Sequence, residues 1–223
     1  MGLLDLFRNA QPALVRQAMG DVQRMLVIGQ QMFGAATGTL LDNEILDLNL
    51  ASLDSQVNAL EEDVRRALLE HLAVDPEREL VLSLKLVSVV NEAERIGDLG
   101  KALARNAALS RHPRRGPLVE RLRILRGRVD QAFGDTIVCF AERDSGRALV
   151  VIERHASIKA DAASLMRALA TSDVPTNEAT VLALSIHMIS RVSSHLSNIA
   201  SAMTGTYEML RRGGHARSER DAA

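Results

Sequence analysis

Two pairs of oxygen-bearing side chains, each spaced four residues apart, stand in the first half of the chain. Glu94 and Asp98 form one pair, and Asp54 and Asn58 form the other. In a helix, residues four apart lie on the same face, so each pair would present two oxygen ligands together. Such oxygens suit hard or borderline cations. The same spacing is also common on ordinary solvated acidic faces, so the residues alone leave both interpretations open.

Helices must position these pairs, because apolar residues recur at alternating steps of four and three, as in helix–helix seams. We expect six helices. The first runs from Asn9, a candidate N-cap, with Pro12 in its first turn, to a breaker at Gly34–Gly38. The second carries a seam from Leu46 to Val64 and ends near Ala73.

The third helix is expected to open at Asp75-Pro76-Glu77, which has an N-cap followed by proline at the first helical position. The remaining three are expected over about 118–142, from the turn at 144–146 to about 171, and from the break at 173–176 to Gly213. Seam residues should be buried, among them Leu53, Val57, Leu86, Val89, Ile96, Leu196 and Ile199.

The order of helices and breaks repeats in the two halves of the chain. We therefore expect an all-α fold of two tandem three-helix bundles that arose by internal duplication. The first repeat spans 1–112 and the second 113–212, followed by a disordered tail at 213–223. Aligning the third helix with the sixth places Glu94 on Ser190 and Asp98 on Ser194.

Composition excludes several classes of protein. With 27 basic and 28 acidic side chains among 223 residues, the chain has no electrostatic footprint for nucleic acid or an anionic membrane. Aromatic residues make up only 2%, which argues against β-sandwiches and barrels. The most apolar stretch, Leu80 to Val90, is too short for a membrane span. A single cysteine and the lack of a signal peptide indicate a cytoplasmic protein.

The segment Asn91-Glu92-Ala93-Glu94-Arg95-Ile96-Gly97-Asp98 resembles the signature of the PhoU family, the regulators of phosphate uptake. That family carries Glu-Arg-Ile-Gly-Asp in the third helix of each repeat and an acidic pair upstream, which Asp54-Ser55-Gln56-Val57-Asn58 resembles. Asn198-Ile199-Ala200 is similar to the Asn-Ile-Ala that often follows the motif. The resemblance covers the chain from about Asn9 to Arg212.

The resemblance implies an iron or zinc cluster on each repeat, which here would use Asp54, Asn58, Glu94 and Asp98 of the first repeat. In the second repeat, His155 and Lys159 stand where the upstream acidic pair belongs, and Ser190 and Ser194 replace the motif's two acids. We therefore expect no metal on the second repeat.

For function, the resemblance implies a non-enzymatic brake on phosphate uptake and on the phosphate-starvation response. Its implied partners are a phosphate ABC transporter and a phosphate-sensing histidine kinase, with a homodimer as a further expectation. The sequence adds no nucleophile–base pair, phosphate-cradling loop or cofactor motif. The alternative is a metal-free helical adaptor that serves a sodium-coupled or permease-type phosphate transporter.

Overall fold

A computed structural model describes residues 11–204 of the chain. This part of the chain contains six long α-helices, no β-strand and one π-helical turn, so the predicted all-α fold is confirmed. The helices are α2 (Ala13–Thr37), α3 (Leu50–Val74), α4 (Leu80–Ala107), α5 (Pro117–Glu142), α6 (Ser145–Ala170) and α7 (Thr176–Met203); the π-helical turn η1 (Gly38–Asp42) follows α2.

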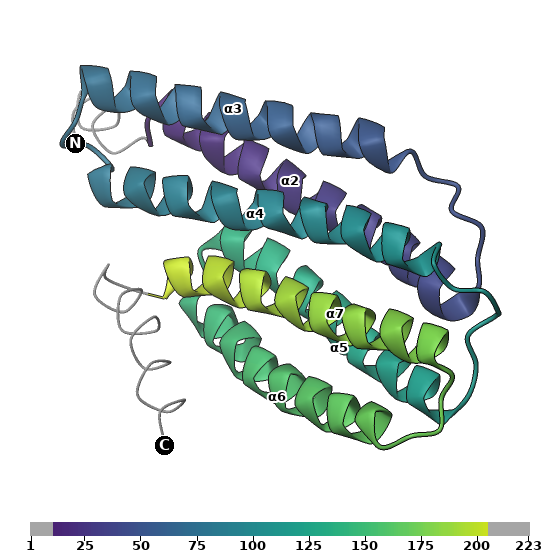
Figure 1. The fold of residues 1–223 in the computed structure, drawn as a ribbon. Coiled ribbons are helices and arrows are strands. Elements are labelled where there is room, and N and C mark those ends of the chain that lie inside the picture. The colour runs from purple at the N-terminus through teal and green to yellow at the C-terminus, as the bar shows by residue number, and fades with distance from the viewer. Residues whose placement is uncertain (1–10, 205–223) are drawn as a thin grey trace.

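The six helices form two antiparallel three-helix bundles that lie side by side (Figure 1). The first bundle contains α2, α3 and α4, and the second contains α5, α6 and α7. The bundles join where α4 packs on α7 and α2 packs on α5. One apolar core runs through both, from Val15 on α2 to Ala202 on α7. The residue boundaries predicted for the two repeats stay a prediction, and the predicted tail lies outside the described residues.

The first helix differs from its prediction at both ends. Its expected N-cap, Asn9, lies outside the described residues, and Pro12 is the N-cap instead of part of the first turn. The expected breaker at Gly34–Gly38 was wrong, because the chain stays helical to Thr37 and then continues as η1 to Asp42. Burial explains the continuation, since Phe33, Leu40 and Leu41 are all removed from solvent and hold the segment to the core.

The second helix starts later than its apolar seam indicated. Asn49 caps α3, and its side-chain oxygen accepts a hydrogen bond from the backbone N–H of Ser52 at 3.0 Å. Leu46 therefore belongs to the link before the helix and is 38% exposed. Leu53 is half-buried instead of buried. The other six predicted core positions, from Val57 to Ile199, are buried.

The start predicted for the third helix was also wrong. Asp75 closes α3 through a backbone hydrogen bond to His71, and α4 begins only at Leu80. Between them Glu79 adopts a left-handed conformation with φ of 54°. The His71 imidazole Nε2 lies 2.7 Å from the carbonyl oxygen of Arg78, which ties this turn to the end of α3. A local hydrogen-bonded turn thus overrides the Asp-Pro-Glu start signal.

Two glycines let the helices of the first bundle approach closely. A Cβ added at Gly100 on α4 would lie 3.0 Å from Cβ of Met32 on α2 and 3.4 Å from its backbone carbonyl carbon. A Cβ at Gly29 on α2 would lie 2.9 Å from Cγ2 of Ile96 on α4. The α2–α4 contact therefore depends on the absence of these side chains.

The link between the bundles, residues 108–116, is fastened to the end of α2. Arg114 donates from Nε to the carbonyl oxygen of Leu40 at 2.5 Å and from Nη2 to that of Thr39. The Arg114 backbone N–H also donates to the Asn43 side-chain oxygen at 3.0 Å. These bonds satisfy carbonyls of η1 that have no helical partner.

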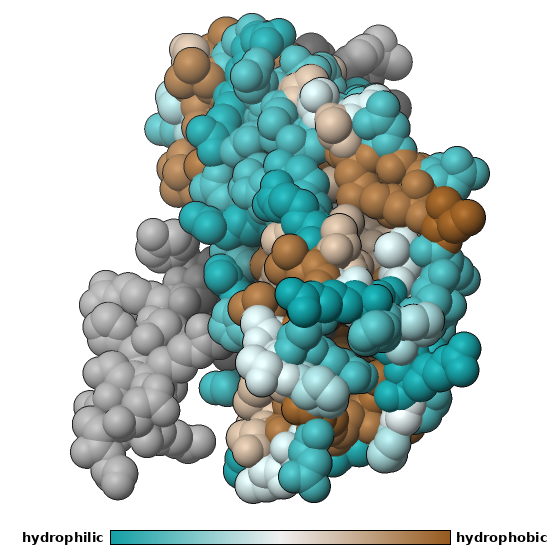
Figure 2. Space-filling view, turned by 45° about the vertical axis from the view of Figure 1, so that its right-hand side comes forward, coloured by the Kyte–Doolittle hydropathy of each residue, from teal (hydrophilic) through white to brown (hydrophobic). Residues whose placement is uncertain are grey.

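Figure 2 shows a face of the molecule on which hydrophilic side chains predominate and apolar side chains gather in separate patches. Among the described residues, the most exposed large apolar side chain is Ile45, at 91%, in the link between η1 and α3. Between residues 11 and 204, no helix is long and apolar enough to cross a membrane.

Candidate functional site

The acidic pairs predicted from sequence meet at the contact between α3 and α4, with a lysine between them. Lys101 Nζ lies 2.6 Å from Oδ1 of Asp54 and 2.8 Å from Oδ1 of Asp98. Glu94 lies one helical turn before Asp98 and shares a hydrogen bond with its carboxyl group. Asn58, one turn beyond Asp54 on α3, is exposed. The ammonium group of Lys101 thus supplies the positive charge that the carboxylates attract.

The charges of this cluster shift one another's protonation. The hydrogen bond from Lys101 lowers the pKa of Asp98, against the effect of burial. Burial, the hydrogen bond to Asp98 and repulsion from Asp98 and Glu61 raise the pKa of Glu94. Burial alone would lower the pKa of Lys101, but its two carboxylate partners outweigh burial and raise it. Because the pKa of Glu94 is raised and that of Asp98 is lowered, Glu94 is the less ready of the two to serve as an anionic ligand.

As arranged, these residues do not fit the implied metal. No group of three or more histidine, cysteine, aspartate or glutamate side chains in the described part of the chain is placed to hold a metal ion. A cation ligated by both Asp54 and Asp98 would compete with the ammonium group that already bridges them. The sequence held a signal for this, since Lys101 follows Asp98 by three residues, a spacing that makes side-chain contact on a helix.

The start of the motif serves packing between helices. Asn91 accepts a hydrogen bond from Arg65 of α3 at 2.7 Å, and Arg65 also pairs with Glu61 at 2.6 Å. The carboxylate of Glu92 reaches the second bundle, where it accepts from Asn198 Nδ2 at 2.8 Å. Ile96 lies fully in the core. The polar side chains of the motif thus connect α4 to α3 and to α7.

Glu92 also lies 2.8 Å from Nδ1 of His195 on α7. Burial would raise the pKa of Glu92, but the hydrogen bonds from His195 and Asn198 outweigh it and lower the pKa. The carboxylate is therefore ionised and accepts the proton on Nδ1 of His195. Sequence reasoning missed this contact, because Glu92 and His195 are 103 residues apart and no local spacing connects them.

The four residues that replace the acids in the second half also come together. His155 and Lys159 of α6 and Ser190 and Ser194 of α7 line one pocket of about 410 Å³. The four residues that the alignment set opposite the acidic pairs therefore lie together in the structure. The first edge carries carboxylates and a lysine, whereas the second carries no carboxylate among its lining residues.

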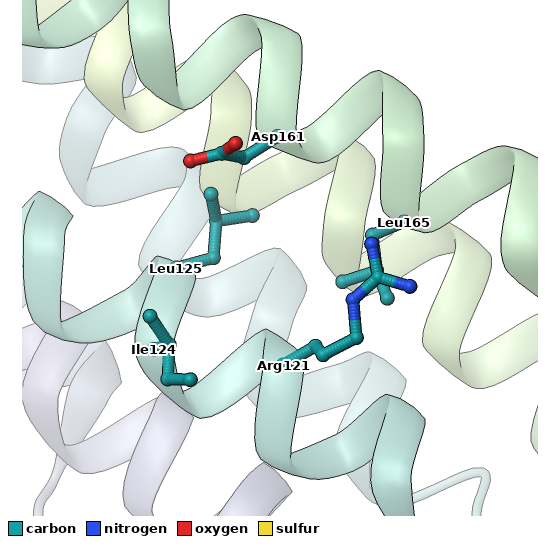
Figure 3. A pocket seen from close by; sticks show the side chains of 5 residues that line it. All are labelled: Arg121, Ile124, Leu125, Asp161 and Leu165. Atoms are coloured by element: carbon teal, nitrogen blue, oxygen red, sulfur yellow. The ribbon is translucent and has the colours of Figure 1, made fainter.

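A smaller hollow of about 210 Å³ lies between α5 and α6 (Figure 3). Ile124 and Leu125 line it from α5, and Asp161 and Leu165 line it from α6, with Arg121 reaching across. Asp161 already pairs with Arg128. The hollow is thus a shallow gap between two helices with its carboxylate neutralised.

The six long helices of residues 11–204 define an all-α helical-bundle protein, and comparison with known proteins points to one family. Residues 22–107 match the family model described as the PhoU domain. The resemblance stated from the Glu-Arg-Ile-Gly-Asp segment is thereby confirmed. No curated protein matches the chain.

Two solved structures share the fold. PhoU from Pseudomonas aeruginosa is 20% identical, with a TM-score of 0.78 over 90% of this chain and 98% of its own. The phosphate transport system regulatory protein PhoU from Streptococcus pneumoniae is 14% identical, with a TM-score of 0.77 over 89% of this chain and 95% of its own. The matches cover both bundles, so the duplicated architecture is that of these proteins.

Proposed function

We propose that this chain is a non-enzymatic, cytoplasmic regulator of phosphate transport. It acts as a brake by contact with a phosphate ABC transporter and with a phosphate-sensing histidine kinase. The observation that carries the proposal is the PhoU domain at residues 22–107, set in a fold shared with a protein described as a phosphate transport system regulator. The helical surfaces offer docking faces for partner proteins.

The first turns of α4 provide the face that we expect to contact the transporter. Leu80, Val81, Leu84 and Val87 are each at least 40% exposed and recur at helical spacing along α4. Exposed apolar side chains grouped on one helix face are typical of protein–protein contacts. A homodimer that uses the same face is the other occupant to test, and light scattering of the wild type and of Leu84→Glu distinguishes it.

The test of the function removes the gene from its source organism and measures uptake of labelled phosphate together with expression of a phosphate-starvation reporter. We expect uptake and reporter expression to rise in phosphate-rich medium and to return to normal with the wild-type gene. The Leu84→Glu variant should fail to restore them, whereas Glu153→Lys, at an exposed site on α6 of the other bundle, should restore them. Unchanged uptake and reporter in the deletion strain would refute the proposal.

The second candidate is a metal-free adaptor for a sodium-coupled or permease-type phosphate transporter. The bridge from Lys101 to Asp54 and Asp98 favours it, because an internal ammonium group already pairs with two carboxylates that the expected iron or zinc would need. Metal on the first repeat stays a prediction that requires Lys101 to leave both carboxylates. Crosslinking from α4 in membranes, followed by identification of the crosslinked transporter, separates the ABC transporter from the permease.

A further inference from the structure

The pocket of the second bundle gathers nitrogen donors from two helices. His155 and Lys159 lie on α6, while His187, Arg191 and His195 lie on α7. Lysine and arginine carry full positive charges at neutral pH, and an imidazole contributes at least one N–H group, although the N–H on Nδ1 of His195 is already donated to Glu92. Among residues 11–204, no aspartate or glutamate lines the pocket, so no carboxylate of its lining neutralises Lys159 or Arg191.

Neutral hydrogen-bonding groups complete the lining. Ser190 and Ser194 stand one helical turn apart on α7, and Asn198 stands one turn further on. Hydroxyl and amide groups donate hydrogen bonds to oxyanions without the desolvation cost of another charge. A row of neutral donors at four-residue spacing, flanked by a lysine and an arginine, is therefore complementary to an anion with several oxygen atoms.

The floor of the pocket is held in place from the first bundle. Glu92 accepts from both His195 and Asn198, at 2.8 Å each, and so fixes the orientation of two lining side chains. On the α6 side, Nδ1 of His155 lies 2.8 Å from Oγ of Ser193. These contacts order part of the lining before any ligand arrives, which reduces the entropy cost of binding.

Within the described part of the chain, one buried polar atom of this lining lacks a hydrogen-bond partner. His195 is 8% exposed, and its Nε2 finds no partner among residues 11–204, although Nδ1 is engaged by Glu92. A buried polar atom without a partner is costly, and a ligand with both donor and acceptor oxygens can supply that partner. Inorganic phosphate has such oxygens, because its monoprotonated form carries a P–OH group as well as anionic oxygens.

We propose that this pocket binds a phosphate-class oxyanion, either free inorganic phosphate or the phosphoryl group of a phosphate ester or condensed phosphate. The volume of about 410 Å³ admits more than one tetrahedral anion, so both kinds of source fit. In the alignment of the two halves, this pocket stands where the first bundle has its acidic side chains. It carries basic side chains instead. The proposal goes beyond the regulatory function, because it concerns binding by the isolated chain and needs no transporter.

The test is calorimetric titration of the purified full chain at constant ionic strength, since screening by added salt would otherwise change the result. Inorganic phosphate, glycerol phosphate and pyrophosphate are the three probes, and sulfate is the comparison anion. Saturable binding of at least one phosphate probe, at least fivefold tighter than sulfate, is the expected result. The probe that binds tightest identifies the source of the phosphoryl group.

The variant Lys159→Gln, Arg191→Gln should weaken binding of that probe at least tenfold. Both side chains are exposed, so the fold should tolerate their replacement. The control is Arg167→Gln, which removes a positive charge from an exposed site on α6 outside the pocket and should leave the affinity within twofold. Phosphate-dependent shifts of the His187 imidazole signals in NMR spectra locate the ligand without any variant.

Three outcomes would overturn the proposal. These are no saturable binding of any phosphate probe at millimolar concentration, equal affinity for sulfate, and equal affinity of the pocket variant and the Arg167→Gln control. Each leaves the regulatory proposal intact, because that proposal is tested in cells by uptake and reporter expression.

Discussion

Glu92 of α4 and His195 of α7 are joined across the two bundles, with Oε2 and Nδ1 2.8 Å apart. A second polar contact between the same two helices is buried, where Asn106 Nδ2 donates to Oγ of Ser185 at 2.8 Å. The pair of Glu92 and His195 connects the residue that stands two positions before Glu94 of the acidic edge with a residue that lines the basic pocket of the other bundle. This hydrogen bond therefore links the helix that carries Glu94 and Asp98 to the lining of the pocket in the other bundle.

We expect a measurable coupling energy between these two residues. In a double-mutant cycle with Glu92→Gln and His195→Ala, the interaction should be about 1–2 kcal/mol, as for a hydrogen bond to a charged group. Urea unfolding of the wild type, both single variants and the double variant measures it. Strict additivity of the two single effects would show that the contact contributes nothing.

Leu86 should be among the most sensitive core positions. It is fully buried on α4, so Leu86→Ala should lower the free energy of unfolding by about 2–5 kcal/mol. Leu84 on the same helix is 47% exposed, and Leu84→Ala should cost well under half of that. Chemical denaturation of both variants checks the assignment, and a loss of only a few tenths for Leu86→Ala would contradict it.

Gly100→Ala should destabilise the first bundle even though alanine favours helix. The added Cβ would press on Met32 at 3.0 Å and on its backbone, which is expected to cost about 1–3 kcal/mol. Gly127 on α5 is the matched control, because nothing lies within 4 Å of an added Cβ there. Gly127→Ala should raise stability by about 0.5–1 kcal/mol. Opposite shifts in melting temperature for the two variants are the expected result.

Cys139 should make stability fall at alkaline pH. It is completely buried, and burial raises the pKa of its thiol from 9.0 to about 11. The unfolded chain therefore loses this proton at lower pH than the folded chain, so the contribution is full below pH 9 and is lost between pH 9 and 11. Cys139→Ala should remove that part of the pH dependence. Denaturation of both proteins between pH 7 and 11 measures it, and parallel pH profiles would contradict the assignment.

Removal of Lys101 should increase metal binding. In Lys101→Gln, Asp54 and Asp98 lose their internal cation and become available to a divalent ion. Elemental analysis after equilibration with iron or zinc should find more metal in this variant than in the wild type. The double variant Glu94→Ala, Asp98→Ala serves as the control with least metal. If the wild type already binds metal as fully as Lys101→Gln, the lysine does not compete for the carboxylates.

Much of the fold could be predicted because helix periodicity is local. Apolar residues spaced alternately four and three positions apart correctly predicted six helices and six of the seven named core residues. The predicted helix boundaries were wrong where non-local burial or a hydrogen-bonded turn determines where a helix begins or ends, as at Gly34–Gly38 and at Glu79. The site was predicted only in part. The four-residue spacing placed Glu94 beside Asp98. The positive charge between Asp98 and Asp54 comes from Lys101, and the position of this bridge depends on how closely α3 approaches α4.

The fastening of Arg114 to the end of α2 determines how the two halves respond to force. A linker between repeats usually serves as a hinge, but here its guanidinium is bound to carbonyl oxygens of Thr39 and Leu40 in the first bundle. Rotation of one bundle against the other would break these bonds and expose the shared core. Because one apolar core also runs through both bundles, we expect residues 11–204 to unfold as one cooperative unit.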